Sequence, residues 1–159
     1  GVARDAAKAF ALYREAAERG NALGQVLLGG AYQRGAGTAR DPAAALQWFR
    51  RAAAQGYPAG KSALAFMYAG GLGVTKDESR AAALYREAAD QGHAEAMFNL
   101  GIMTEEGRGT ARDLPEAFRL YQAAAEKGHG DARRILERAG RFTRAEDIFD
   151  PFKRPGDRR

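Results

Sequence analysis

Apolar and small residues recur at spacings of three and four along most of the chain, which is typical of one face of an α-helix. The pattern is clear in two neighbouring segments, residues 22–34 and 42–55. Its members are Leu28, Ala31 and Tyr32 in the first segment and Ala45, Trp48, Phe49, Ala52 and Ala53 in the second. Glycines between the segments favour a loop there. The pattern therefore predicts a pair of helices joined by a short connection.

The same pattern returns every 36 residues, a period typical of helical repeats. The positions that keep this interval are Gly20, Gly56, Gly92 and Gly128; Asp5, Asp41, Asp77 and Asp113; Tyr13, Phe49, Tyr85 and Tyr121; and Leu12, Trp48, Leu84 and Leu120. We expect each glycine to end a helix pair in the left-handed conformation. Each aspartate is expected to cap a second helix, as the Asp41-Pro42 sequence indicates. Both series of large residues are expected to form the core between repeats.

The period divides the chain into a solenoid at residues 1–139 and a C-terminal segment at residues 140–159. The solenoid comprises a partial repeat (1–20), three full repeats (21–56, 57–92 and 93–128) and a terminal capping helix (129–139). The first helix is expected at about Ala6–Arg19, without the helix that precedes it in a full repeat. Because the chain begins at Gly1 without methionine, we expect a processed product or an excerpt. The C-terminal segment predicts a short helix at residues 143–149 and a flexible basic tail.

These residues resemble a known family, the Sel1-like repeat, a relative of the tetratricopeptide repeat. The resemblance is carried by Ala94-Glu-Ala-Met-Phe-Asn-Leu-Gly-Ile-Met, Gly107-Arg-Gly, Asp113, Ala117, Leu120-Tyr121, Ala124-Ala125 and Gly128. It implies an all-α fold, a right-handed α-solenoid of helix-turn-helix repeats with a tetratricopeptide-like superhelix. It also implies an adaptor or scaffold; many relatives are bacterial, and both the periplasm or envelope and the cytoplasm stay open. Thr104 stands where other repeats have Tyr32 and Tyr68, so looser packing of that helix pair is expected.

Composition and charge narrow the classes of partner. The chain has no cysteine, which excludes disulfides and thiolate metal sites. No apolar run approaches the length of a membrane span. The net charge is +5, and residues 131–159 carry nine basic and six acidic residues. A basic excess concentrated at one end predicts no specific nucleic-acid binding, and four tail cations would bind only weakly and salt-sensitively.

No set of residues in the sequence predicts catalysis, a cofactor or a metal site. His93 and His129 lie one period apart, without a third ligand, and are interpreted as solvent-exposed turn residues. The Gly-x-Gly loops lack the context of phosphate-binding loops and are interpreted as a connection shared by all repeats. Glu105 and Glu106 are interpreted as a solvated or ligand-facing pair. We therefore predict that the chain is not an enzyme.

A partner protein or peptide is expected on the concave surface, which the first helix of each pair lines in tetratricopeptide folds. The candidate contact residues are Val26, Arg34, Ser62, Phe66, Glu95, Phe98, Ile102, Glu105 and Arg134. Val26, Phe66, Phe98 and Ile102 would form an apolar strip with charges on either side, a pattern typical of interaction sites. Two alternatives stay open at this point. Curvature of the superhelix buries the strip, or Ile148, Phe149 and Phe152 of the tail fill it.

In some tetratricopeptide relatives, an asparagine near the position of Asn99 helps to clamp the C-terminal carboxylate of a bound peptide. The basic residues that complete such a clamp are missing here, so that function is not carried over.

The sequence thus predicts a protein–protein interaction scaffold or adaptor with no chemistry of its own. The alternative is a regulatory module of a larger signalling or envelope protein, which positions or inhibits a catalytic partner. End-to-end self-association is a further hypothesis, because the first helix has an uncovered apolar face.

Overall fold

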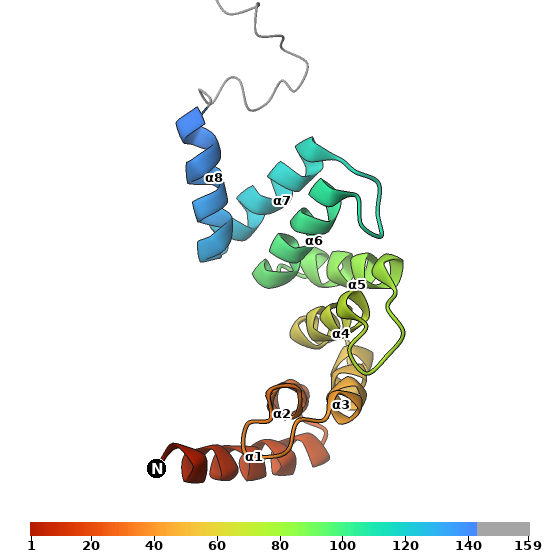
Figure 1. The fold of residues 1–159 in the computed structure, drawn as a ribbon, viewed down its shortest axis with the longest axis vertical. Coiled ribbons are helices and arrows are strands. Elements are labelled where there is room, and N and C mark those ends of the chain that lie inside the picture. Colours follow the sequence, from red (N-terminus) through yellow and green to blue (C-terminus); the bar gives the residue numbers. More distant parts are fainter. Residues whose placement is uncertain (143–159) are drawn as a thin grey trace, which may run out of the picture.

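The protein folds into an arc of helices stacked along its long axis (Figure 1). The computed structural model describes residues 1–142, and within them it contains eight helices and no strand. The helices are α1 (Val2–Glu18), α2 (Ala22–Arg34), α3 (Pro42–Ala54), α4 (Pro58–Gly70), α5 (Glu78–Asp90), α6 (Ala94–Glu106), α7 (Leu114–Glu126) and α8 (Gly130–Phe142). The predicted all-α solenoid of helix-turn-helix repeats is confirmed. None of the helices in this part of the chain is long and apolar enough to span a membrane.

Consecutive helices pack against each other, and a second set of contacts runs along the inside of the arc. There, α2 contacts α4 and α4 contacts α6. Figure 1 shows these three helices on the concave side, with α3 and α5 outside them. The concave surface is therefore built from the first helix of each pair.

Aspartate caps begin α3, α5 and α7, as the sequence predicts. The carboxylates of Asp41, Asp77 and Asp113 each accept a hydrogen bond, at 2.9 Å, from the backbone N–H three residues later. The prediction is wrong for Asp5, which lies inside α1 because that helix begins at Val2 and not near Ala6. The other three aspartates are held outside their helices by a backbone bond to the preceding helix, whereas the Asp5 amide bonds to the Gly1 carbonyl.

Glycines at two kinds of turn keep the repeats in register. Gly20, Gly56, Gly92 and Gly128 have φ of 77 to 90° and end each pair in the predicted left-handed conformation. The second glycine of each Gly-x-Gly loop also lies against backbone of the preceding repeat. A Cβ on Gly109 would lie 2.0 Å from the Glu78 carbonyl oxygen. A Cβ on Gly37 would lie 2.2 Å from the Ala6 carbonyl oxygen, and one on Gly73 would lie 2.8 Å from that of Pro42.

Both predicted series of large residues contribute to the core between repeats, the first more deeply. Tyr13 of the first series is half-buried, and Leu84 and Leu120 of the second pack against the core. Phe49, Tyr85 and Tyr121 are buried. Trp48, Leu84 and Leu120 are half-buried, and Leu12 is 65% exposed. The placement of Leu12 in the core is therefore wrong. The small side chain of Ala52 lets the next helix approach so closely that a Cβ on Gly60 would stand 2.6 Å from the Ala52 Cβ.

Thr104 of α6 is fully buried, and its packing differs from the expectation. The α6–α7 pair packs as closely as the other helix pairs, so the predicted looseness is wrong. Threonine in place of tyrosine at this position has a different consequence. Among the described residues, the Thr104 hydroxyl is a buried polar group without a hydrogen-bond partner.

Replacing Thr104 with valine should stabilise the fold. The substitution keeps the shape and removes a buried hydroxyl without a partner, which should raise the free energy of unfolding by about 1 kcal/mol. Urea denaturation followed by circular dichroism measures it. The control is Thr104→Ser, which keeps the hydroxyl, loses a methyl group and should be destabilised by about 1 kcal/mol. A less stable Thr104→Val protein would contradict the assignment of an unpartnered hydroxyl.

The terminal helix α8 continues through Gly140 to Phe142, past the boundary expected after residue 139. The short helix expected at residues 143–149 and the basic tail lie outside the described residues.

Candidate functional site

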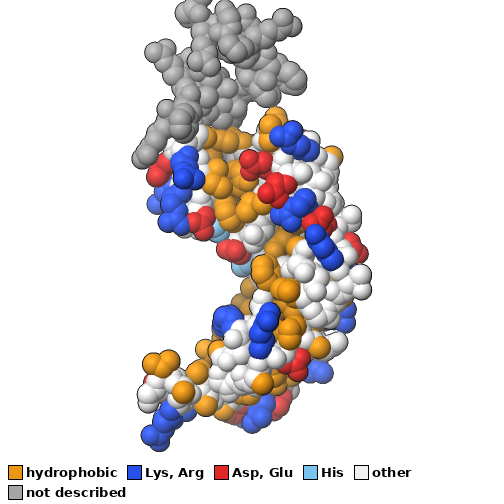
Figure 2. Space-filling view, in the orientation of Figure 1, with side chains coloured by type: hydrophobic (Ala, Val, Ile, Leu, Met, Phe, Trp, Pro, Cys, Tyr) orange, Lys and Arg blue, Asp and Glu red, His pale blue; other side chains and the backbone are white. Residues whose placement is uncertain are grey.

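The concave face of the arc is hollowed, and apolar side chains gather in and beside the hollow (Figure 2). A cleft of about 250 Å³ lies between α4 and α6, and we call it the α4–α6 cleft. Its lining residues are Phe66, Ala69, Gly70, Tyr85, Asn99, Ile102, Met103 and Arg108. A cleft of about 560 Å³ between α6 and α8 is called the α6–α8 cleft. Its lining residues are Phe98, Asp131, Arg134, Ile135, Glu137 and Arg138.

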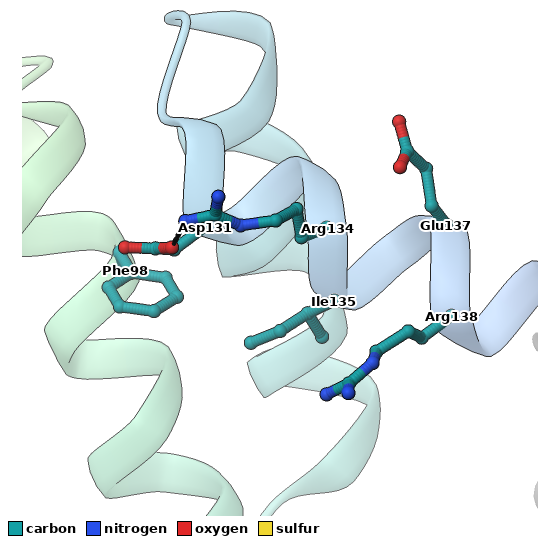
Figure 3. A pocket seen from close by; sticks show the side chains of 6 residues that line it. All are labelled: Phe98, Asp131, Arg134, Ile135, Glu137 and Arg138. Atoms are coloured by element: carbon teal, nitrogen blue, oxygen red, sulfur yellow. Dashed lines mark hydrogen bonds and ion pairs between the residues drawn. The ribbon is translucent and has the colours of Figure 1, made fainter.

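The α6–α8 cleft has an apolar side and a charged rim (Figure 3). Phe98 of α6 faces Ile135 of α8 across it, while Glu137 points away. Arg134 pairs with Asp131 on the same helix, and this hydrogen bond lowers the pKa of the Asp131 carboxyl. The rim is therefore charged at neutral pH and the interior is apolar.

Phe98 packs against His129, the residue before α8. The two rings stack with centroids 4.3 Å apart, and Tyr121 packs on Phe98 at 5.8 Å. His129 Nε2 lies 2.9 Å from Glu95 Oε2, and its Nδ1 accepts a hydrogen bond from the Ala132 N–H at 3.3 Å. The interpretation of His129 as a solvent-exposed turn residue is wrong, because the Phe98 ring and the first turn of α8 cover its side chain.

His93 is also more enclosed than expected. It is half-buried at the start of α6, and burial lowers its pKa while the charge of Glu95 partly opposes that change. The described residues contain no group of three or more histidine, aspartate or glutamate side chains able to hold a metal ion.

The two glutamates at the end of α6 have different partners. Glu105 Oε2 accepts a hydrogen bond from the Tyr121 hydroxyl at 2.6 Å. Burial, followed by this hydrogen bond, raises the pKa of Tyr121, so the phenol stays a donor. Glu106 binds Arg108, which also reaches Glu78 Oε1 at 3.4 Å. Glu105 and Glu106 are both exposed to solvent, in line with their interpretation as a solvated or ligand-facing pair, and each also binds a neighbouring side chain.

Four of the candidate contact residues line the clefts. Phe66 and Ile102 line the α4–α6 cleft, and Phe98 and Arg134 line the α6–α8 cleft. Phe66 is 48% exposed, whereas Phe98 and Ile102 are half-buried. Curvature thus covers part of the predicted strip and leaves Phe66 open.

The remaining candidates lie elsewhere. Glu95 and Glu105 are exposed on α6, where their carboxylates bind His129 and Tyr121. Ser62 is buried and does not face solvent, because α4 turns it into the helix interface.

The two candidates on α2 line neither cleft. Val26 is half-buried against the core. The Arg34 guanidinium folds back over Gly30, with its Nη1 3.0 Å from where a Cβ would stand.

Tyr85, Arg108 and Ile135 are among the lining residues that sequence reasoning missed, because it counted only selected concave positions of first helices. The tail residues Ile148, Phe149 and Phe152, proposed as an internal occupant, lie outside the described residues.

Comparison with known proteins identifies the repeat. A sequence model of the Sel1 repeat matches residues 1–21, 22–57, 58–93 and 94–129. No curated protein matches the chain.

Solved structures show the same architecture. A Sel1 repeat protein from Oxalobacter formigenes is 31% identical with a TM-score of 0.80, over 86% of this chain and 54% of its own. A protective antigen present in uropathogenic Escherichia coli strains, which displays an SLR fold, is 33% identical with a TM-score of 0.73, over 82% of this chain and 28% of its own. Cysteine-rich protein B of Helicobacter pylori, 24% identical with a TM-score of 0.66 over 85% of this chain and 97% of its own, shares the fold. The chain thus spans 54% and 28% of the lengths of the first two.

Proposed function

Because the chain belongs to the Sel1 repeat family, we propose that it is a scaffold that binds a segment of a partner protein in its concave groove. Sel1-repeat proteins are generally protein-interaction scaffolds and typically non-catalytic. The proposed contacts are Phe66, Ile102 and Phe98 as apolar anchors, with Glu95, Glu105 and Arg134 at the rim.

One observation carries this proposal: a large aromatic side chain stands open at the mouth of a cleft on the concave face. Phe66 is 48% exposed and lines the α4–α6 cleft together with half-buried Ile102. Exposed aromatic groups beside a concave apolar surface are the usual anchors of protein interfaces. Charged side chains around the two clefts would set the direction of a bound segment.

Truncating Phe66 should weaken peptide binding by about tenfold or more, because aromatic anchors carry much of the binding energy of such interfaces. Peptides would first be selected on the purified chain from a random twelve-residue library. Their dissociation constants for the parent chain and for Phe66→Ala would then be measured by fluorescence polarisation.

The matched control for Phe66 is Leu114→Ala, at a position that is 45% exposed at the start of α7 and lines neither cleft. It should change affinity less than about twofold. Phe98 is a poorer test, since its truncation also removes the ring on which His129 stacks. Equal affinity of the parent and Phe66→Ala chains would overturn the siting of the groove.

A further inference from the structure

Two consecutive repeats place the same tyrosine in different surroundings. In the later repeat, Tyr121 of α7 donates its hydroxyl proton to Glu105 at the end of α6, at 2.6 Å. Tyr85 of α5 stands one period earlier, and the position equivalent to Glu105 is Ala69 at the end of α4. The earlier tyrosine therefore lacks the carboxylate that the later one binds.

The space left by that exchange is the α4–α6 cleft. Ala69 and Gly70 line it where the later repeat has the side chains of Glu105 and Glu106. Tyr85 also lines the cleft, although its side chain is only 3% exposed. Within the described residues its hydroxyl makes no hydrogen bond. The hydroxyl is therefore open to the cleft rather than fully buried, and an incoming acceptor can bind its proton there.

The electrostatics around Tyr85 keep its hydroxyl a donor. Burial raises its pKa, the charge of Glu95 adds to that rise, and Arg108 opposes it. Arg108 lines the same cleft and brings five N–H donors, of which two contact Glu106 and Glu78. An incoming acceptor thus meets a neutral phenol and a guanidinium with donors to spare.

The rest of the cleft suits the stem of a side chain. Phe66, Ile102 and Met103 give it apolar walls, and Tyr85 and Arg108 line the same cleft. A volume of about 250 Å³ is of the order of one or two side chains. The cleft therefore combines apolar walls with the hydrogen-bond donors of Tyr85 and Arg108.

We propose that the α4–α6 cleft binds an aspartate or glutamate side chain of the partner peptide, whose carboxylate accepts the Tyr85 hydroxyl proton as Glu105 accepts that of Tyr121. This proposal rests on the proposed function, since it names the chemistry of the segment held in the groove. A carboxylate is favoured over a neutral amide because charged hydrogen bonds are about twice as strong as neutral ones, and because Arg108 adds a cation. The carboxylates of Glu78 and Glu106 already bind Arg108, and the charge of Glu95 acts on Tyr85, so the hydrogen bond from the phenol carries the preference and not the net charge of the cleft.

The test uses peptides selected on the parent chain, synthesised with each acidic residue kept or replaced by its amide. At one position the parent should prefer glutamate over glutamine, or aspartate over asparagine, by about tenfold. Tyr85→Phe keeps the ring and removes the donor, so the preference should fall to about twofold or less while the amide peptides bind as before.

A second variant supplies the carboxylate from within the chain. Ala69→Glu recreates at Tyr85 the arrangement that Glu105 has at Tyr121, so the acidic peptides should lose at least tenfold in affinity. Ala69→Gln fills the same space without the charge and serves as its control. It should discriminate less between acidic and amide peptides than Ala69→Glu does. A crystal structure of Ala69→Glu should show its carboxylate bonded to the Tyr85 hydroxyl.

The outcomes separate the two proposals. A preference for acid that disappears in Tyr85→Phe supports both. Peptides that need Phe66 but bind equally as acid and amide overturn the carboxylate site and leave the groove. An acid preference that survives in Tyr85→Phe places the carboxylate elsewhere and also overturns the site. Failure of the parent chain to select any peptide overturns the groove and the carboxylate site together.

Discussion

Replacing Gly109 with alanine should lower the free energy of unfolding by about 2–5 kcal/mol, one of the largest effects expected from adding a single methyl group to this chain. Two costs combine. The backbone at Gly109 has φ of 67°, which costs an L-residue about 1–2 kcal/mol. The new Cβ would also stand 2.0 Å from the Glu78 carbonyl oxygen, a rigid group that cannot rotate away. The loop would have to lift off the first turn of α5.

Gly56 provides the matched control for Gly109. Its φ is 77°, and a Cβ there would have nothing within 4 Å. Gly56→Ala should therefore show only the backbone cost, about 1–2 kcal/mol. The difference between the two variants, measured by urea denaturation, isolates the close approach of neighbouring repeats. Equal losses would show that this approach contributes nothing to stability.

Truncating Phe49 to alanine should cost about 3–5 kcal/mol, because the change leaves a cavity between α2 and α3. Phe49 is 2% exposed and belongs to the main hydrophobic cluster. Its ring lies so close to Gly29 that a Cβ on that glycine would stand 2.6 Å from it. Because repeats contact mainly their neighbours, the loss should appear as local opening of the first repeats, measurable by hydrogen exchange.

Two further variants test the cause of the Phe49 effect. Leu12→Ala removes an apolar side chain that is 65% exposed and should change stability by about 0.5 kcal/mol or less. Gly29→Ala alone should destabilise the protein, because the new methyl group overlaps the Phe49 ring. In the Phe49→Ala background the same methyl group enters the cavity that the ring has left. The double variant should therefore be more stable than the sum of the single losses. Additive losses would mean that the ring does not occupy the space opposite Gly29.

The candidate site shows what comparison at the 36-residue period can reveal. Tyr85 and Tyr121 are equivalent positions with the same residue, whereas the equivalent positions Ala69 and Glu105 differ, and this difference is visible in the sequence. What the sequence does not show is that a second-helix tyrosine reaches the end of the first helix. The search among first-helix positions alone therefore passed over Tyr85.

The sequence pattern also could not predict which side chains of a single helix are buried. Ser62 and Phe66 lie four residues apart on α4, and both were placed on the concave surface. The structure buries Ser62 and exposes Phe66. Polarity would have favoured the opposite arrangement, so the geometry of the neighbouring helices decides it.

By itself the sequence determined the repetition, the helix pairs and the aspartate caps of α3, α5 and α7, although not the start of α1. These features depend on local spacing: an aspartate three residues before a free N–H, a glycine where φ must be positive, and an apolar stripe at helical intervals. Only the tertiary structure decided which side chains face the hollow and that the rings of His129 and Phe98 stack. It also decided that no carboxylate accepts a hydrogen bond from the Tyr85 hydroxyl as Glu105 does from that of Tyr121. Those outcomes depend on the curvature of the stack. That curvature follows from the sizes of many interface side chains acting together, and the period alone does not fix it.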